Sequence, residues 1–348
     1  MGDIEEKGYL KYPGKTPTRY EILDVLSAAN GQFVSGNELA RLHDISRTAV
    51  WKNIQTLIDE GFSIEAANKK GYRLMGIADV ISPPKIMARL NTTCLGRTIL
   101  YVPRTSSTNY DAKLLADFVE DGTLFIAETQ TGGKGRLGRR WESPLGGIFM
   151  SLVLKPYIDP SRVPGLALIT GYSIAKTLGD IYGIPTKVKW PNDVLVNDRK
   201  IAGILCEMRA ELDAVSHVIV GVGINANVEL SLMPDDIKDK SSSLKEELGQ
   251  SIDRNSLVAS ILNDFEPLYS EFLDLGLQAF QPRLEEMLAY KGQPVIVENV
   301  TLGAKTFWKG NLHGLDSEGR LVLSGPEYGK KVFPAGDLSL RIETQEKK

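Results

Sequence analysis

Glycines alternate with basic residues in one stretch of the sequence, Glu128-Thr-Gln-Thr-Gly-Gly-Lys-Gly-Arg-Leu-Gly-Arg-Arg-Trp141. Glycine lets the backbone come close to a ligand, and lysine and arginine side chains neutralise phosphate charge and donate hydrogen bonds to its oxygens. The Gly-x-x-x-x-Gly-Lys-Ser/Thr pattern of a Walker loop is absent here. A Gly/Arg run can also be a flexible RNA-binding tail. Because this run lies between two predicted strands, we expect a phosphate-binding loop inside a folded domain.

A predicted hairpin follows a second basic stretch, Lys189-Trp-Pro-Asn-Asp193, and returns through Arg-Lys200-Ile-Ala-Gly-Ile-Leu205. Lysines held on strands can bring a carboxylate and a phosphate together, and Asn192 and Asp193 lie at the turn into the hairpin. The Asp193 carboxylate is a hard oxygen ligand of the type that Mg²⁺ prefers. The alternative interpretation is a surface hairpin whose charges are solvated.

Two shorter motifs carry weaker signals. Ser107-Thr-Asn109 begins a predicted helix, where short polar side chains could contact a ligand but are also common as ordinary helix caps. Gly221-Val-Gly-Ile-Asn225 follows an apolar strand, and a lone Gly-x-Gly is weak support for nucleotide binding.

All four motifs lie within residues 83–289, where the apolar periodicity predicts a mixed α/β domain. The expected strands are Thr98–Val102, Leu124–Glu128, Gly147–Leu154, Thr186–Trp190, Val194–Val196, Lys200–Glu207 and His217–Ile224. The expected helices are Asn109–Val119, Ser161–Tyr182, Ser256–Leu275 and Pro282–Leu288. Residues 290–345 show short strands and turns without a helix pattern, which predicts a small β-barrel.

Residues 18–76 show the pattern of a winged helix-turn-helix, three short helices followed by a hairpin, and we expect residues 1–17 to form a flexible tail. The helix-turn-helix runs from Gly36 to Gln55, and the alternative is a small protein-binding helical module. We expect Trp51 to be a core or interface residue. The side chains suited to base edges and phosphates are Arg47, Thr48, Lys52 and Asn53 on the third helix and Lys69 and Lys70 at the hairpin tip.

Composition limits the kinds of site and the cellular compartment that we expect for the protein. The net charge of −3 means that nucleic-acid binding needs a local basic patch. Two distant cysteines, Cys94 and Cys206, and three scattered histidines argue against a disulfide framework and a zinc site. Apolar runs are too short to span a membrane and the first residues lack a secretion signal, so we expect a cytoplasmic protein.

Taken together and in this order, the four motifs resemble those of biotin protein ligases, and the resemblance extends over residues 18–343. With the winged helix in front, the chain is similar to the bifunctional subgroup of biotin ligase and biotin-operon repressor. The resemblance implies a class II synthetase-like sheet in the central domain and an SH3-like barrel over residues 290–345. Two loop positions depart from the family pattern: Lys134 keeps an arginine's charge but not its fork of donors, and Leu137 loses a charge.

The resemblance implies two half-reactions. The carboxylate of biotin attacks the α-phosphate of ATP, which binds with Mg²⁺, to give biotinyl-5′-AMP and pyrophosphate, and no prosthetic group takes part. A lysine of a biotin-carrier domain, as in acetyl-CoA carboxylase, then attacks the mixed anhydride. The implied biotin contacts are Ser107, Thr108, Asn109, Gln130, Lys134, Gly135, Arg136 and Lys200. The implied adenylate contacts are Arg139, Trp141, Lys189, Asn192 and Asn225, and the implied catalytic residues are Lys200, Arg136 and Asp193, the last also as a Mg²⁺ ligand.

The repressor part of the resemblance implies operator DNA as a partner and a homodimer with biotinyl-5′-AMP as corepressor. Two alternatives keep the ligase fold: a lipoate–protein ligase, and a biotin ligase without regulatory DNA binding. A third is a ligand-sensing transcription factor with a dead catalytic site, against which the presence of Lys200, Arg136 and Asp193 argues.

Overall fold

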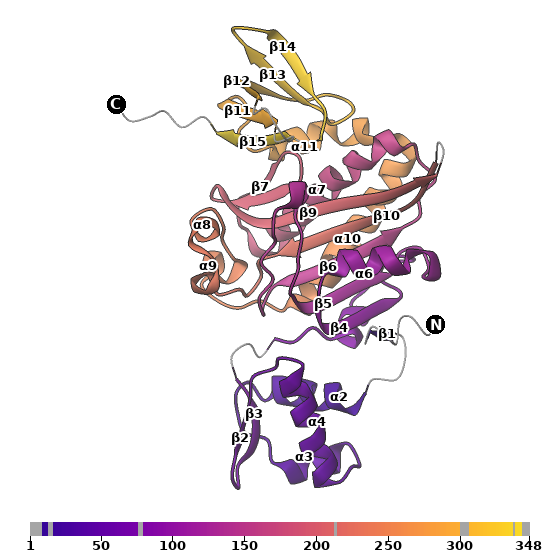
Figure 1. The fold of residues 1–348 in the computed structure, drawn as a ribbon, viewed down its shortest axis with the longest axis vertical. Helices are drawn as coiled ribbons and strands as arrows, with labels where there is room; N and C mark the ends of the chain where they lie inside the picture. The colour runs from indigo at the N-terminus through magenta and orange to yellow at the C-terminus, as the bar shows by residue number, and fades with distance from the viewer. Residues whose placement is uncertain are drawn as a thin grey trace.

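The computed structural model describes residues 9–12, 17–75, 79–211, 214–299, 306–336 and 338–342. Three units follow one another along the long axis of the ribbon (Figure 1). The winged-helix unit lies at one end, a large sheet with helices lies in the middle, and a small sheet lies at the other end. Across these described ranges, every helix is too short or too polar to cross a bilayer.

The winged-helix unit forms as the sequence predicts. Ser35 and Ser46 cap its second and third helices, accepting hydrogen bonds from the backbone N–H groups of Glu38 and Ala49, both at 3.1 Å. One apolar face of the third helix, including the fully buried Ile54, packs into a core shared by the three helices. The elements are α2 (Thr18–Ala28), α3 (Gly36–Leu42), α4 (Arg47–Asp59), β2 (Ile64–Ala67) and β3 (Gly71–Leu74).

Eight strands form the central sheet, in the order β1-β4-β5-β6-β10-β9-β8-β7. β4 and β5 are parallel, and the other neighbouring pairs are antiparallel. The mixed α/β character predicted for this part of the chain is confirmed. The strands are β1 (Leu10–Tyr12), β4 (Ile99–Thr105), β5 (Leu124–Gln130), β6 (Ile148–Leu154), β7 (Thr186–Lys189), β8 (Asp193–Val196), β9 (Arg199–Glu211) and β10 (Ala214–Ile224).

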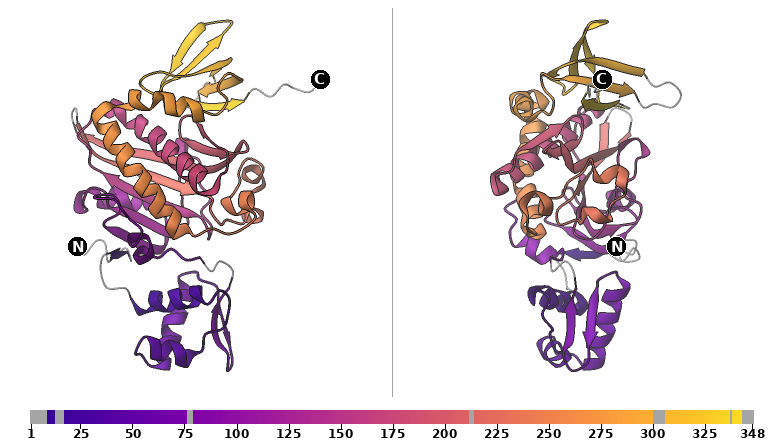
Figure 2. Two further views of the ribbon diagram at one scale, coloured as in Figure 1. Left: turned by 180° about the vertical axis from the view of Figure 1, so that it is seen from behind. Right: turned by 90° about the vertical axis from the view of Figure 1, so that its left-hand side faces the viewer.

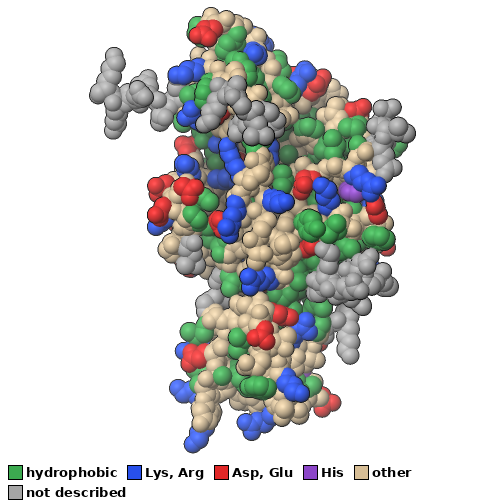
Figure 3. Space-filling model, viewed as in Figure 1, with side chains coloured by type: hydrophobic (Ala, Val, Ile, Leu, Met, Phe, Trp, Pro, Cys, Tyr) green, Lys and Arg blue, Asp and Glu red, His purple; other side chains and the backbone are tan. Residues whose placement is uncertain are grey.

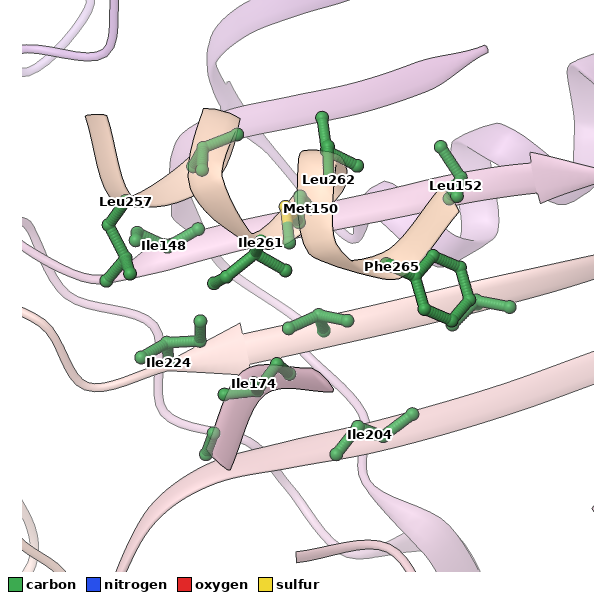
Figure 4. Packing of buried hydrophobic residues seen from close by; sticks show 14 of the residues in the cluster. Ile148, Met150, Leu152, Ile174, Ile204, Ile224, Leu257, Ile261, Leu262 and Phe265 are labelled. Atoms are coloured by element: carbon green, nitrogen blue, oxygen red, sulfur yellow. The ribbon is translucent and has the colours of Figure 1, made fainter. Parts of the chain in front are cut away.

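Helices cover both faces of this sheet, with α7 (Val163–Tyr182) and α10 (Arg254–Leu275) on one face and α6 (Thr108–Leu115) on the other (Figures 1 and 2). Buried side chains of β6, β9 and β10 pack against those of α7 and α10 (Figure 4). Each large apolar side chain buried there stabilises the fold by about 1.5–3 kcal/mol, so this layer holds the strands that carry the site. The remaining helices are α5 (Pro83–Met87), α8 (Asp235–Lys238), α9 (Leu244–Leu248) and α11 (Gln281–Met287).

A second sheet of five strands follows, in the order β14-β13-β12-β11-β15. Among the residues that the structure describes, the end strands β14 and β15 do not pair with each other. The sheet is therefore open, and the closed barrel predicted for residues 290–345 is not confirmed. The strands are β11 (Pro294–Asn299), β12 (Thr306–Leu315), β13 (Leu321–Gly325), β14 (Gly329–Phe333) and β15 (Leu338–Ile342).

The N-terminal strand β1 corrects the expectation of a flexible tail over residues 1–17. Leu10–Tyr12 pairs antiparallel with Ile99–Tyr101 at the edge of the central sheet. Tyr9 and Tyr12 are 3% and 4% exposed, and burial of two aromatic rings offsets the entropy lost on ordering so short a segment. Residues 1–8 and 13–16 lie outside the described residues.

Candidate functional site

The first turn of α6 lies against β5 and β6 and forms a polar wall. Ser107 caps the helix, accepting a hydrogen bond from the backbone N–H of Tyr110 at 3.4 Å. The side-chain oxygen of Gln130 accepts from the backbone N–H of Thr108 at 2.8 Å, and its amide donates to Ser143 Oγ at 2.9 Å. The structure thus brings together three of the residues predicted to contact biotin: Ser107, Thr108 and Gln130.

Asn109 is also predicted to contact biotin. Both the nitrogen and the oxygen of its side-chain amide already form hydrogen bonds within the protein. Its nitrogen donates to the Leu205 carbonyl at 3.2 Å and to the Glu207 carboxylate at 3.0 Å, and its oxygen lies 2.6 Å from Ser151 Oγ. A Cβ on Gly221 would overlap the Asn109 side chain, so this position requires glycine. Asn109 therefore joins α6 to β6, β9 and β10. The sequence analysis missed Ser151, although a single hydroxyl in an otherwise apolar strand is a signal.

The segment between β5 and β6, residues 131–147, is called the Gly/Arg loop, and it is folded back on itself. The backbone N–H of Trp141 donates to the Gly133 carbonyl at 2.9 Å, and that of Gly135 donates to the Arg139 carbonyl at 2.7 Å. A Cβ on Gly133 would lie 2.6 Å from the Trp141 carbonyl oxygen, so the fold of the loop depends on this glycine. Leu137, one of the two positions that depart from the family pattern, has φ of 60° and an exposed side chain.

Arg136 reaches from this loop to two other segments. Its guanidinium donates to Asn192 Oδ1 at 3.2 Å and to the backbone carbonyl of Gly336, which lies between β14 and β15. Asn192 is itself fixed, because its amide donates to the Ile204 carbonyl at 2.7 Å. Lys134, the neighbouring basic residue of the loop, is exposed. Arg136 thus connects the loop, the strand hairpin and the C-terminal sheet.

Lysines from two strands lie beside Asp193. The Lys200 ammonium is 2.5 Å from the Asp193 carboxylate. Burial lowers the pKa of Lys189; the charge of Asp193 opposes this effect, and the charges of Lys200 and Arg139 add to it. Cations therefore outnumber the carboxylate in this group, and an anionic ligand would experience a favourable potential there.

Trp141 covers the floor formed by β9 and β10. The Lys200 ammonium lies 5.0 Å from the centre of its ring, within the range of a cation–π contact. A Cβ on Gly203 or Gly223 would lie 2.8 or 2.5 Å from the indole, so both glycines allow the ring to lie on the strands. Within the described ranges its buried Nε1 has no hydrogen-bond partner. The ring therefore offers an aromatic face and a free donor beside the cations.

Asn225 directly follows β10. It is 3% exposed, its amide donates to the Ser242 carbonyl at 3.0 Å, and its backbone N–H donates to the Ile201 carbonyl at 2.8 Å. The side chain predicted to contact the nucleotide thus holds the segment that follows β10.

The donor set near Asp193 fits one kind of metal binding. The described residues contain no cluster of three His, Cys, Asp or Glu side chains that could build a metal cage. Mg²⁺ usually binds proteins through one or two carboxylates and keeps waters and substrate phosphates as its other ligands. A single carboxylate therefore suits a Mg²⁺ ion that arrives with ATP.

A second candidate surface lies on the winged-helix unit. A hollow of about 670 Å³ separates α4 from the β2–β3 hairpin, and its lining includes Arg47, Thr48 and Lys69. Lys and Arg side chains also gather at the tip of this unit and along the middle of the molecule on the face shown (Figure 3). The hollow and the basic side chains fit a nucleic-acid backbone.

One residue of α4 differs from the expectation for it. Trp51 is 52% exposed and lines the hollow, so a core position is wrong for it, because it lies off the apolar face that Val50 and Ile54 form. The Asn53 amide donates to the Ala49 carbonyl of its own helix at 2.8 Å. Lys52 and Lys70, two of the predicted DNA contacts, are exposed.

Known proteins match both the central unit and the winged-helix unit. The model of the biotin/lipoate A/B protein ligase family matches residues 101–225, and that of a helix-turn-helix domain matches residues 18–73. The chain is 36% identical over 323 residues to the bifunctional ligase/repressor BirA of Bacillus subtilis, covering 92% of this chain and 98% of the relative. It is 30% identical to BirA of Escherichia coli over 314 residues, covering 90% and 94%.

A solved structure agrees with these sequence matches. The biotin protein ligase from Aquifex aeolicus in complex with biotin and ATP superimposes with a TM-score of 0.61 at 30% identity, covering 70% of this chain and 99% of that one. The fold and the site thus define a protein ligase of the biotin/lipoate class. The chain belongs to the family of bifunctional biotin ligases that carry a helix-turn-helix repressor domain.

Proposed function

We propose that the chain activates biotin with ATP and transfers it to a lysine of a carrier domain of the acetyl-CoA carboxylase type. The observation that carries this proposal is the group of Lys200, Lys189 and Asp193, in which the Lys200 ammonium contacts the Trp141 ring, with Arg136 bonded to the neighbouring Asn192. Cations of this kind can hold two anions, a carboxylate and a phosphate, against each other. The relatives named as biotin ligases favour biotin over lipoate.

Biotin would bind between α6 and the Gly/Arg loop. The short polar side chains of Ser107, Thr108, Asn109 and Gln130 suit its ureido ring, and the backbone of Gly135 with Lys134 would close over it. Its carboxylate would then point toward Lys200 and Arg136.

In the first step, a carboxylate oxygen of biotin attacks the α-phosphorus, the bond to the bridging oxygen breaks, and pyrophosphate leaves. Lys200 and Arg136 stabilise the negative charge on the transferring phosphoryl group. Burial favours the neutral form of Lys189, and a bound phosphate would favour its charged form. Trp141 would cover the adenine, with Arg139, Asn192 and Asn225 assigned to the nucleotide side. Mg²⁺ bound to the ATP phosphates would neutralise charge, with Asp193 as a protein oxygen ligand.

In the second step, the amine of the carrier lysine attacks the carbonyl carbon of biotinyl-5′-AMP. An amide bond forms, AMP leaves with the electron pair of the anhydride bond, and the amine loses a proton. Until the carrier arrives, the loop that contains Arg136 would keep water from the anhydride.

The winged-helix unit, which we assign to residues 18–76, would bind operator DNA through Arg47, Thr48, Lys52, Asn53, Lys69 and Lys70. One such unit contacts one half-site, so specific binding calls for a homodimer. We assign biotinyl-5′-AMP as the corepressor that favours the dimer. Residues 83–289 would be the catalytic domain, with a class II synthetase-like sheet, and residues 290–345 an SH3-like unit.

The ligase proposal is tested with radiolabelled biotin, ATP and a biotin-carrier domain. We expect label on the carrier, one pyrophosphate released for each label, and no effect of excess lipoate. Label transfer that lipoate suppresses, or transfer without ATP, would contradict the proposal.

A further inference from the structure

Arg254, the first residue of α10, is 1% exposed and joins three parts of the chain. Its Nη1 donates to the Glu128 carboxylate at 2.9 Å and to the Gly147 carbonyl at 2.7 Å, and its Nε donates to the Asp79 carboxylate at 2.5 Å. Glu128 lies on β5 and Gly147 immediately precedes β6, so these two residues mark the two ends of the Gly/Arg loop. Asp79 belongs to the segment that connects the winged-helix unit to the central sheet.

That connecting segment is bonded to the same cluster through its backbone. The N–H of Ile81 donates to the second carboxylate oxygen of Glu128 at 2.5 Å. The N–H of Ser82 donates to Asn255 Oδ1 at 2.7 Å, and the Asn255 amide donates to the Val80 carbonyl at 2.8 Å. Glu128 therefore binds the Arg254 guanidinium with one oxygen and the connecting segment with the other.

The cluster is also close to the proposed biotin pocket along the chain. Glu128 is two residues before Gln130, whose side chain holds the first turn of α6. Glu128 is 2% exposed, and a buried charge that loses its partner is strongly destabilising. A displacement at either end of the loop would therefore be passed to the connecting segment, because the ion pairs have to move together.

We propose that Arg254 is a positioning residue that couples the Gly/Arg loop to the winged-helix unit. When the loop closes on the adenylate, Glu128 and Gly147 become fixed, and Arg254 then fixes residues 79–82. The ligand thereby sets the direction in which the DNA-binding unit leaves the central sheet. This coupling rests on the proposed function, since it takes biotin and ATP as the source of the ligand that orders the loop.

Another contact between the two units supplies a matched control. Asp24 of α2 accepts from the Lys85 ammonium of α5 at 2.8 Å and from Ser82 Oγ at 3.5 Å, and it contacts neither Arg254 nor the ends of the loop. Asp79→Asn and Asp24→Asn each remove one carboxylate charge near the connection between the units, but only Asp79 lies in the Arg254 cluster. Arg254→Lys keeps the charge and loses the fork of donors.

The test is hydrogen–deuterium exchange of the full chain, with and without biotin plus ATP. In the unaltered chain we expect the ligands to slow exchange in residues 130–147 and at Val80–Ser82. In Asp79→Asn and Arg254→Lys, the factor by which the ligands slow exchange at Val80–Ser82 should be roughly tenfold smaller, because one hydrogen bond to a charged group is lost. The ligands should still slow exchange in the loop of both variants. Asp24→Asn should keep both effects.

A purely structural role for Arg254 would raise exchange equally with and without ligand, and that result would overturn the coupling. So would equal ligand-dependent slowing at Val80–Ser82 in all variants, or slowing of the loop alone in the unaltered chain. Slowing at neither segment would contradict the proposed ligand site and the coupling together. Asp79→Asn keeps the test decisive if Arg254→Lys does not fold.

Discussion

The Lys200 ammonium lies 2.5 Å from the Asp193 carboxylate, and the two residues stand on the neighbouring strands β8 and β9. Lys200 is 30% exposed at its side chain, so it remains accessible to a ligand while its carboxylate partner holds it in place. A cation that is already oriented stabilises developing negative charge without reorganising during the reaction. This pair explains why a strand hairpin is needed at this position of the site.

Replacing Lys200 tests the first half-reaction. Lys200→Ala should lower the rate of biotin-dependent pyrophosphate exchange by about two to three orders of magnitude, because removal of one charged stabiliser costs about 3–4 kcal/mol of transition-state energy. Lys187→Ala is the control, since Lys187 is exposed on β7 and bonds the Glu286 carbonyl instead of the site. Near-normal exchange in Lys200→Ala would rule out the role.

The pH dependence of stability tests the environment of Lys189. Burial lowers the pKa of Lys189 in the folded chain, so between that pKa and the unfolded value of about 10.4 the unfolded chain binds more protons. This residue therefore makes the free energy of unfolding rise with pH in that window. The free energy of unfolding in urea is measured at several alkaline pH values for Lys189→Met and for the unaltered chain. The amount by which Lys189→Met exceeds the unaltered chain in this free energy should shrink as pH rises. Lys187→Met, which removes an exposed lysine of the same strand, is the control for the substitution itself. A stability difference in favour of Lys189→Met that grows with pH would contradict this role of burial.

Arg136 is expected to retain the intermediate, because it bonds Asn192 on one side and Gly336 on the other. Arg136→Gly should release biotinyl-5′-AMP, so that lysines of bystander proteins become labelled in the radiolabelled-biotin assay. Arg140→Gly removes an exposed arginine of the same loop, paired with Glu142, and should label the carrier alone. Carrier-specific labelling by Arg136→Gly would show that the loop does not depend on this residue.

Tyr9, which directly precedes β1, should contribute to the stability of the central unit. The Tyr9 hydroxyl donates to the Asp111 carboxylate of α6 at 2.8 Å, so Tyr9→Phe should lower the free energy of unfolding by about 1–2 kcal/mol. Tyr157→Phe removes a hydroxyl from a residue that is 95% exposed and should change stability little. Equal urea midpoints for the two variants would mean that this hydrogen bond adds nothing.

Much of this molecule follows from local sequence signals. The serine caps at Ser35 and Ser46, and the apolar runs of β6 and β10, are sufficient to predict the winged helix and the inner strands. The motifs around Lys200 and Arg136 also predict the site. Basic residues that alternate with glycines, or that lie on a strand hairpin, are seldom needed to stabilise the fold itself.

Other features depend on contacts between distant residues and leave little local trace. β1 is a short strand stabilised by the edge of β4, and neither its length nor its pattern marks it. Asn225 and Asn109 match the motifs, but their amides bond protein groups that the sequence does not identify as neighbours. The partners of Arg254 lie more than 100 positions away in the chain.

We propose that one intermediate, biotinyl-5′-AMP, has two outcomes: transfer of biotin to the carrier, or repression. Sedimentation of the full chain with a biotin-operon fragment tests it most directly, without ligand, with biotin, with biotin plus ATP, and with unbiotinylated carrier added last. We predict occupancy of two half-sites by a dimer when biotin and ATP are both present, and loss of that complex when the carrier consumes the intermediate. Tight binding to both half-sites that stays the same under all four conditions would contradict the account.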